Sequence, residues 1–87
     1  MGVHRDGGFA EYVSAPEANV HLFHKDFDES YLGLVEPFTI GVEVNRRGQI
    51  TKEDKVLVMG SGPIGMTVMQ VAKRNGAQVM MTDIVKQ

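Results

Sequence analysis

The last third of the chain divides into three predicted elements by its pattern of apolar residues. Residues 56–59 form a short continuous apolar run, which is typical of a strand buried on both faces of a parallel sheet. Between residues 63 and 74, apolar side chains recur every three or four positions, which predicts a helix with one face against that sheet. Residues 79–81 form a second apolar run. The order of these patterns predicts a β-α-β unit with parallel strands.

The earlier part of the chain has weaker patterns. Residues 9–13 and 19–23 are short β-prone runs, and they predict a short β segment. Residues 30–47 turn to helical spacing, with Ser30 placed to cap a first short helix and Gly48 placed to end a longer one. The predicted fold class is therefore α/β: a partial β-α-β unit preceded by a short β segment and a linking helix.

Three glycines follow the first predicted strand, and each has a separate mechanical role in a turn that approaches a phosphate. Gly60 permits a tight turn, Gly62 lets the backbone approach a pyrophosphate, and Gly65 lets the helix pack closely on the strand. Pro63 falls at the first helical position, where an N–H is not needed. Free N–H groups at this helix start would face the phosphates. The predicted cofactor-binding residues of this loop are Gly60, Ser61, Gly62, Pro63, Ile64 and Gly65.

An acidic residue ends the second predicted strand. Asp83 follows the glycine motif by about 20 residues, the offset expected for the acid that binds the adenine ribose of a dinucleotide. A carboxylate there accepts hydrogen bonds from ribose hydroxyls and repels a 2′-phosphate, so we predict NAD rather than NADP. The alternative interpretation is a glycine-rich strand-to-helix turn, with Asp83 a solvated residue that closes a strand.

Composition narrows the function classes. The chain has 87 residues, a net charge of −2 and no cysteine. This balance gives no sign of a basic nucleic-acid or membrane surface, and without cysteine the chain supplies no disulfide, thiolate nucleophile or cysteine-bound zinc. The chain has no run of 18 apolar residues and no hydrophobic signal region at its start, so we expect a cytoplasmic protein that contacts neither membrane nor nucleic acid.

The β-α-β unit is only part of a dinucleotide-binding domain. A complete Rossmann domain has about six strands, whereas residues 55–87 provide two strands and one helix. Unpaired edges of an apolar parallel pair favour association with another chain. We therefore expect a homo-oligomer formed through the open sheet edges.

Three strings in the sequence resemble the middle of the zinc-type medium-chain alcohol and polyol dehydrogenases. They are GVHRDGGFAEYVSAP at residues 2–16, VEPFTIGVEVNRRG at residues 35–48 and VLVMGSGPIGMTVMQVAKRNGAQVMMTD at residues 56–83. The closest resemblance is to the sorbitol, threonine and sugar-acid dehydrogenase branch.

The resemblance implies a domain organisation. Residues 1–34 would be the end of a GroES-like catalytic domain, residues 35–54 a linking helix and connection, and residues 55–87 the first β-α-β of an NAD-binding Rossmann domain.

The resemblance also implies an activity, in which a hydride passes from a secondary alcohol to NAD beside a catalytic zinc. Its substrate would be a small-molecule alcohol. Glu36 resembles the family's carboxylate at or beside that zinc. The alternative interpretation of Glu36 is an acid favoured by the dipole at the start of a helix.

The sequence also departs from the family pattern. The upstream Cys, the His-Glu pair and the four-cysteine lobe of the family have no counterpart here. We therefore expect a fragment that is inactive as an isolated chain, and we assign no catalytic residue.

Two other functions stay open. One is a non-catalytic remnant that binds a nucleotide or associates with itself. The other is an FAD-binding half-domain, although such domains place the glycine motif near the chain start and end the second strand in Glu. Here 54 residues precede Lys55 and the acid is Asp83.

Overall fold

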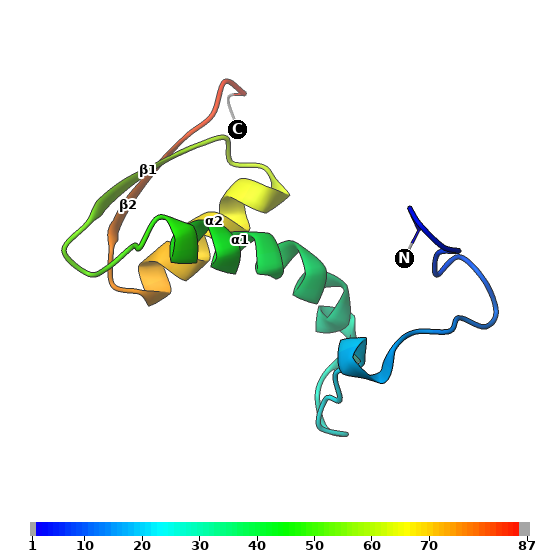
Figure 1. The fold of residues 1–87 in the computed structure, drawn as a ribbon. Helices are drawn as coiled ribbons and strands as arrows, with labels where there is room; N and C mark the ends of the chain where they lie inside the picture. Colours follow the sequence, from blue (N-terminus) through cyan, green and yellow to red (C-terminus); the bar gives the residue numbers. More distant parts are fainter. Residues whose placement is uncertain (1, 86–87) are drawn as a thin grey trace.

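The apolar runs of the last third form the predicted elements. The computed structural model describes residues 2–85, in which one helix packs against one face of a two-stranded parallel sheet and a second helix packs on the first (Figure 1). The α/β class and the β-α-β unit are confirmed, and each of its three elements begins and ends within one residue of the prediction. The elements in chain order are the 3-10 helices η1 (Glu17–Asn19) and η2 (Glu29–Leu34), helix α1 (Val35–Arg47), strand β1 (Lys55–Met59), helix α2 (Pro63–Arg74) and strand β2 (Gln78–Thr82).

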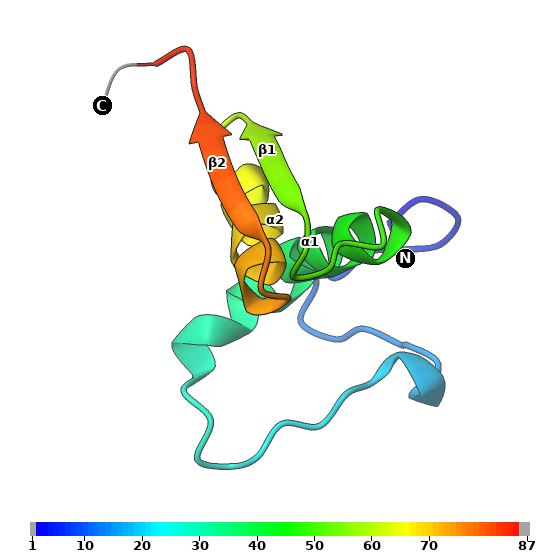
Figure 2. The same ribbon diagram turned by 90° about the vertical axis from the view of Figure 1, so that its left-hand side faces the viewer.

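The two strands have one covered face and one open face. Val58 of β1 pairs with Met81 of β2, and these side chains lie on the face that is covered. Leu57 pairs with Met80 on the other face, where they are 57% and 67% exposed. Figure 2 shows both helices on the same side of the sheet. The prediction that both faces of the strands are buried is therefore wrong for residues 2–85.

The core between sheet and helices is small. Its buried apolar residues are Val58, Ala72 and Ala77, and Ala72 of α2 is completely buried. Ile64 was predicted to share the sheet-facing side of α2, but it is exposed. Ile64 lies in the first turn of α2, at the end of the helix beside the glycine loop.

Helices α1 and α2 make their closest approach at Gly41. A Cβ added there would lie 2.8 Å from both the carbonyl carbon and oxygen of Thr67. Near this contact Asn45, which is 2% exposed, donates from Nδ2 to the carbonyl oxygens of Gly41 (2.8 Å) and Val68 (3.1 Å). A hydrogen-bonded amide thus joins the backbones of the two helices.

The predicted short β segment is wrong. Residues 9–13 and 19–23 form no strand in the structure, and η1 extends into the start of the second run. Figure 1 shows this part of the chain extending away from the helices and the sheet. A strand needs a neighbouring strand to satisfy its backbone, and no other strand among residues 2–85 pairs with these runs.

The predicted helix ends differ in detail from those observed. Asp28 caps η2, since its Oδ1 accepts from the N–H of Ser30 at 2.9 Å, so the prediction of Ser30 as the cap is wrong. Helix α1 ends as expected before Gly48, but Gly48 has φ −71° and the left-handed residue is Gln49, with φ 51°. After α2, Gly76 takes the left-handed conformation, with φ 91°.

Candidate functional site

The site begins with a turn that only glycine adopts readily. Gly60 ends β1 with φ 103°, and its N–H donates to the carbonyl oxygen of Thr82 at 2.7 Å. This bond joins the carboxyl ends of β1 and β2. Gly65 lies in the first turn of α2, and a Cβ there would overlap the carbonyl oxygen of Gly60. The loop is therefore folded tightly back on itself.

The start of α2 leaves backbone donors available. Gly62 caps the helix, and a Cβ added to it would meet no atom within 4 Å. Pro63 is the first helical residue, and Met66 makes the first bond of the helix, to Gly62 at 2.9 Å. The N–H groups of Ile64 and Gly65 precede that bond, so they are the donors that a helix start offers to an anion.

The structure brings Asp83 onto this loop. Oδ2 of Asp83 accepts from the N–H of Ser61 at 2.7 Å and from its hydroxyl Oγ at 2.9 Å. Oδ1 accepts from the N–H of Val85 at 2.9 Å. These donors, the Ser61 N–H foremost, lower the pKa of the Asp83 carboxyl to about 2, so it is ionised at neutral pH.

A hollow of about 580 Å³ opens beside these groups, and it is lined by Met59, Gly60, Thr82, Asp83 and Ile84. It lies at the carboxyl ends of the strands, where α/β sheets bind their ligands. Figure 2 shows both strand arrowheads at this end, next to the start of α2. Sequence analysis missed Met59, Thr82 and Ile84, although each is adjacent in sequence to Gly60 or Asp83. Ile84 is apolar and 100% exposed.

These residues fit one half of a dinucleotide. The open backbone at Gly62 and the N–H groups at the start of α2 suit phosphate oxygens. The Asp83 carboxylate suits hydroxyl donors, and the exposed Ile84 offers an apolar surface beside it. Ser61 belongs to this loop and is half-buried, with its hydroxyl bonded to Asp83.

The structure does not complete a metal site around Glu36. This residue lies exposed in the first turn of α1, and its backbone oxygen accepts from the Thr39 hydroxyl at 2.6 Å. Within residues 2–85, no group of three or more His, Asp or Glu side chains is placed to hold a metal ion. These residues alone do not fit a zinc centre.

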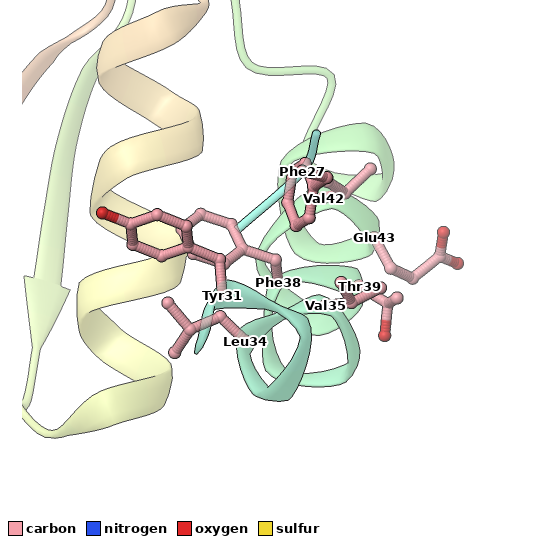
Figure 3. Close-up of a pocket in the computed structure, with 8 residues that line it drawn as sticks. All are labelled: Phe27, Tyr31, Leu34, Val35, Phe38, Thr39, Val42 and Glu43. Carbon is pink, nitrogen blue, oxygen red and sulfur yellow. The ribbon is translucent and has the colours of Figure 1, made fainter. Parts of the chain in front are cut away.

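A second hollow, of about 520 Å³, lies between η2 and α1 (Figure 3). The rings of Phe27 and Tyr31 meet edge to face there, with centroids 6.4 Å apart. The lining side chains are Phe27, Tyr31, Leu34, Val35, Phe38, Thr39, Val42 and Glu43. It contains none of the predicted site residues.

Over the described part of the chain, neither helix has the length and apolar character needed to cross a bilayer.

The structure places the glycine loop and Asp83 side by side, and comparison with known proteins gives the family that the chain resembles. The chain is 46% identical over 83 residues to L-galactonate-5-dehydrogenase of Escherichia coli K12, covering 95% of the chain and 24% of that protein. It is 47% identical over 73 residues to the starvation-sensing protein RspB of Escherichia coli K12, covering 84% of the chain and 22% of RspB.

A third relative is L-threonine 3-dehydrogenase of Streptomyces avermitilis, at 41% identity over 85 residues, covering 97% of the chain and 25% of that protein. No protein-family model and no solved structure matches the chain. These similarities over nearly the whole chain confirm the resemblance to the zinc-type medium-chain dehydrogenases drawn from its sequence. The chain spans about a quarter of the length of these relatives.

Proposed function

We propose that this chain forms the adenosine-binding half of the NAD site of a dehydrogenase that oxidises a small polyol, sugar acid or related secondary alcohol. The observation that carries the proposal is the ionised Asp83 carboxylate held against Ser61 of the glycine loop, beside an open hollow. Relatives named for L-galactonate and L-threonine support the substrate class. NAD, when bound, supplies the acceptor for the hydride.

The choice of NAD over NADP follows from charge. Asp83 is ionised at neutral pH, as any exposed Asp is, and the N–H groups of Ser61 and Val85 and the Ser61 hydroxyl lower its pKa further, to about 2. A fixed negative charge accepts hydrogen bonds from ribose hydroxyls and repels the 2′-phosphate of NADP. The loop residues Gly60 to Gly65 would contact the pyrophosphate through their backbone.

We further propose the domain organisation implied by the family. In it, residues 1–34 belong to the catalytic domain, residues 35–54 connect the domains, and residues 55–87 begin the NAD domain. Glu36 would then lie at or beside a catalytic zinc whose other ligands come from outside these 87 residues. Its exposure in the first turn of α1 supports this role. By themselves, these 87 residues are expected to turn over no alcohol.

A nuclear magnetic resonance titration tests the cofactor. NADH should shift the amide signals of Gly60, Ser61 and Gly65 at lower concentration than NADPH does. Asp83→Asn should weaken NADH binding and reduce the difference in affinity between NADH and NADPH. Asp6→Asn, which removes an exposed carboxylate outside the loop, is the matched control. Equal shifts with both cofactors in the unmodified chain would contradict the assignment.

One observation favours self-association in addition. On the open face of the sheet, the paired residues Leu57 and Met80 are exposed. Exposed apolar side chains of this kind favour burial against a second chain. We propose that the isolated 87-residue chain forms a dimer or larger assembly through β1 and β2. Light scattering after gel filtration should report it, and Leu57→Lys should return the chain to a monomer. A monomer in the unmodified chain would contradict this proposal and leave the cofactor test unaffected.

A further inference from the structure

The Asp83 carboxylate is nearly saturated with donors. A carboxylate offers about four lone-pair positions, two on each oxygen. Oδ2 accepts from both the N–H and the hydroxyl of Ser61, and Oδ1 accepts from the N–H of Val85. Among the hydrogen bonds within residues 2–85, these three leave one position, on Oδ1, for a further donor, and the nearby N–H of Ile84 also lowers the pKa of the carboxyl.

An adenine ribose carries two adjacent hydroxyls, so full recognition by Asp83 needs two positions. The N–H donors of Ser61 and Val85 are fixed by the backbone, and they leave only if the loop moves. The Ser61 hydroxyl needs only a rotation of its side chain. It is the donor that gives way most easily.

We propose that the Ser61 hydroxyl holds, in the free protein, the Asp83 Oδ2 position that a ribose hydroxyl takes when a nucleotide binds. This inference rests on the proposed function and names the residue that sets how the ribose is recognised. The Ser61 N–H stays on Oδ2 and keeps the carboxylate in place, whereas the hydroxyl is exchanged for the ligand. Ser61 is thus a positioning residue through its amide and a placeholder through its hydroxyl.

The arrangement has a measurable consequence. When a nucleotide lacks the competing ribose hydroxyl, the Ser61 hydroxyl returns to Oδ2, so the missing group is replaced by a protein donor. In Ser61→Ala no protein donor returns. The same missing hydroxyl should therefore weaken binding more in the variant than in the unmodified chain.

The test compares AMP, 2′-deoxy-AMP and 3′-deoxy-AMP on the chain and on Ser61→Ala, with dissociation constants from amide shifts. For one of the two deoxy nucleotides, the affinity of the unmodified chain should be at most about twofold weaker than its affinity for AMP. In Ser61→Ala it should be about five- to tenfold weaker, the equivalent of one hydrogen bond. The carboxyl carbon signal of Asp83 should change on Ser61→Ala in the free chain but not in the AMP complex.

Two variants serve as controls. Ser61→Thr keeps a hydroxyl and should behave as the unmodified chain does. Ser14→Ala removes a hydroxyl outside the loop and should change none of the three affinities. The amide signals of Gly60 and Gly76, which have positive φ, report whether each variant keeps the fold.

The outcomes separate this inference from the function on which it rests. If all three nucleotides bind and each missing hydroxyl has the same effect in the chain and in Ser61→Ala, the placeholder role is wrong and the NAD proposal stands. If Ser61→Ala weakens AMP itself about tenfold or more, the hydroxyl stays bonded in the complex, which also overturns the role. If no nucleotide binds the unmodified chain, both proposals fall.

Discussion

The structure divides into a packed part, residues 35–82, and an exposed part, residues 2–34. The packed part holds α1, β1, α2 and β2, and every residue that is buried in the described chain belongs to it. The exposed part has two short 3-10 helices and no buried residue. Residues 35–82 contain the strand partner for each strand and a small apolar core, although one face of the sheet stays open. The β-prone runs of residues 2–34 require a strand that the described chain does not provide.

The contrast explains why the candidate site forms. Each contact that shapes it joins groups within the packed part or Asp83 directly after it: Gly60 to Thr82, Ser61 to Asp83, and Gly65 against Gly60. The family strings in residues 2–16 show ancestry but contribute no contact to this loop. The candidate site therefore forms from residues 55–85, and α1 packs over α2.

The largest expected effect tests these contacts directly. In Gly65→Ala, the new Cβ would overlap the Gly60 carbonyl oxygen, which is backbone and cannot turn aside. The loop or the start of α2 must shift, which should cost about 3 kcal/mol of unfolding free energy. NADH binding should be lost with the loop geometry. Urea unfolding followed by circular dichroism measures the first effect.

Gly8→Ala is the matched substitution in the exposed part. A Cβ there meets nothing within 4 Å, and Gly8 has no positive φ. The unfolding free energy of Gly8→Ala should differ from that of the unmodified chain by less than about 0.5 kcal/mol. If the two substitutions change the unfolding free energy equally, residues 35–82 are not more tightly packed than residues 2–34.

Sequence patterns predicted the packed part well because its signals are local. Apolar runs, Pro63 at a helix start and Gly60 in a tight turn each depend on neighbours within a few residues. The prediction of a strand at residues 9–13 used the same kind of local signal, but a strand forms only with a partner strand.

Local sequence patterns did not predict the contacts between separate helices and strands. Asp83 was predicted as a ribose ligand, and its offset from the glycines placed it near the loop. Its bonds to Ser61 depend on how β2 ends beside β1, which spacing does not specify. Gly41 in the middle of a helix was the available sign of a close helix contact, since glycine is unfavourable there. Its partner Thr67 carries no such sign.

A middle-sized effect is expected where the two helices are joined. Asn45→Ala removes the Nδ2 bonds to Gly41 and Val68 and leaves a small cavity, so it should cost about 1 to 2 kcal/mol. Asn19→Ala, at an exposed position in η1, should cost little. Urea titration of both variants gives the comparison. If Asn45→Ala is no worse than Asn19→Ala, the amide does not hold α1 on α2.

The smallest effect concerns acid. The folded-state pKa of Asp83 is about 2, below the value of about 3.9 for an unfolded Asp. A lowered folded pKa stabilises the fold above the unfolded value, and this contribution is lost as the pH falls from about 4 to about 2. Because Asp83 is exposed to solvent, the contribution is small. The carboxyl carbon signal of Asp83 should titrate near pH 2 in the unmodified chain and at higher pH in Ser61→Ala.

Asp28 in the exposed part provides a comparison for the acid test of Asp83. Its pKa is also lowered, by the side chain and the N–H of Ser30, but that contact lies within one turn and joins no separate elements. Asp83 joins the end of β2 to the loop after β1. Asp83→Asn should therefore remove more of the stability change between pH 4 and pH 2 than Asp28→Asn does. If Asp28→Asn removes as much, the bonds from Ser61 to Asp83 give the packed part no stability beyond that of a local turn.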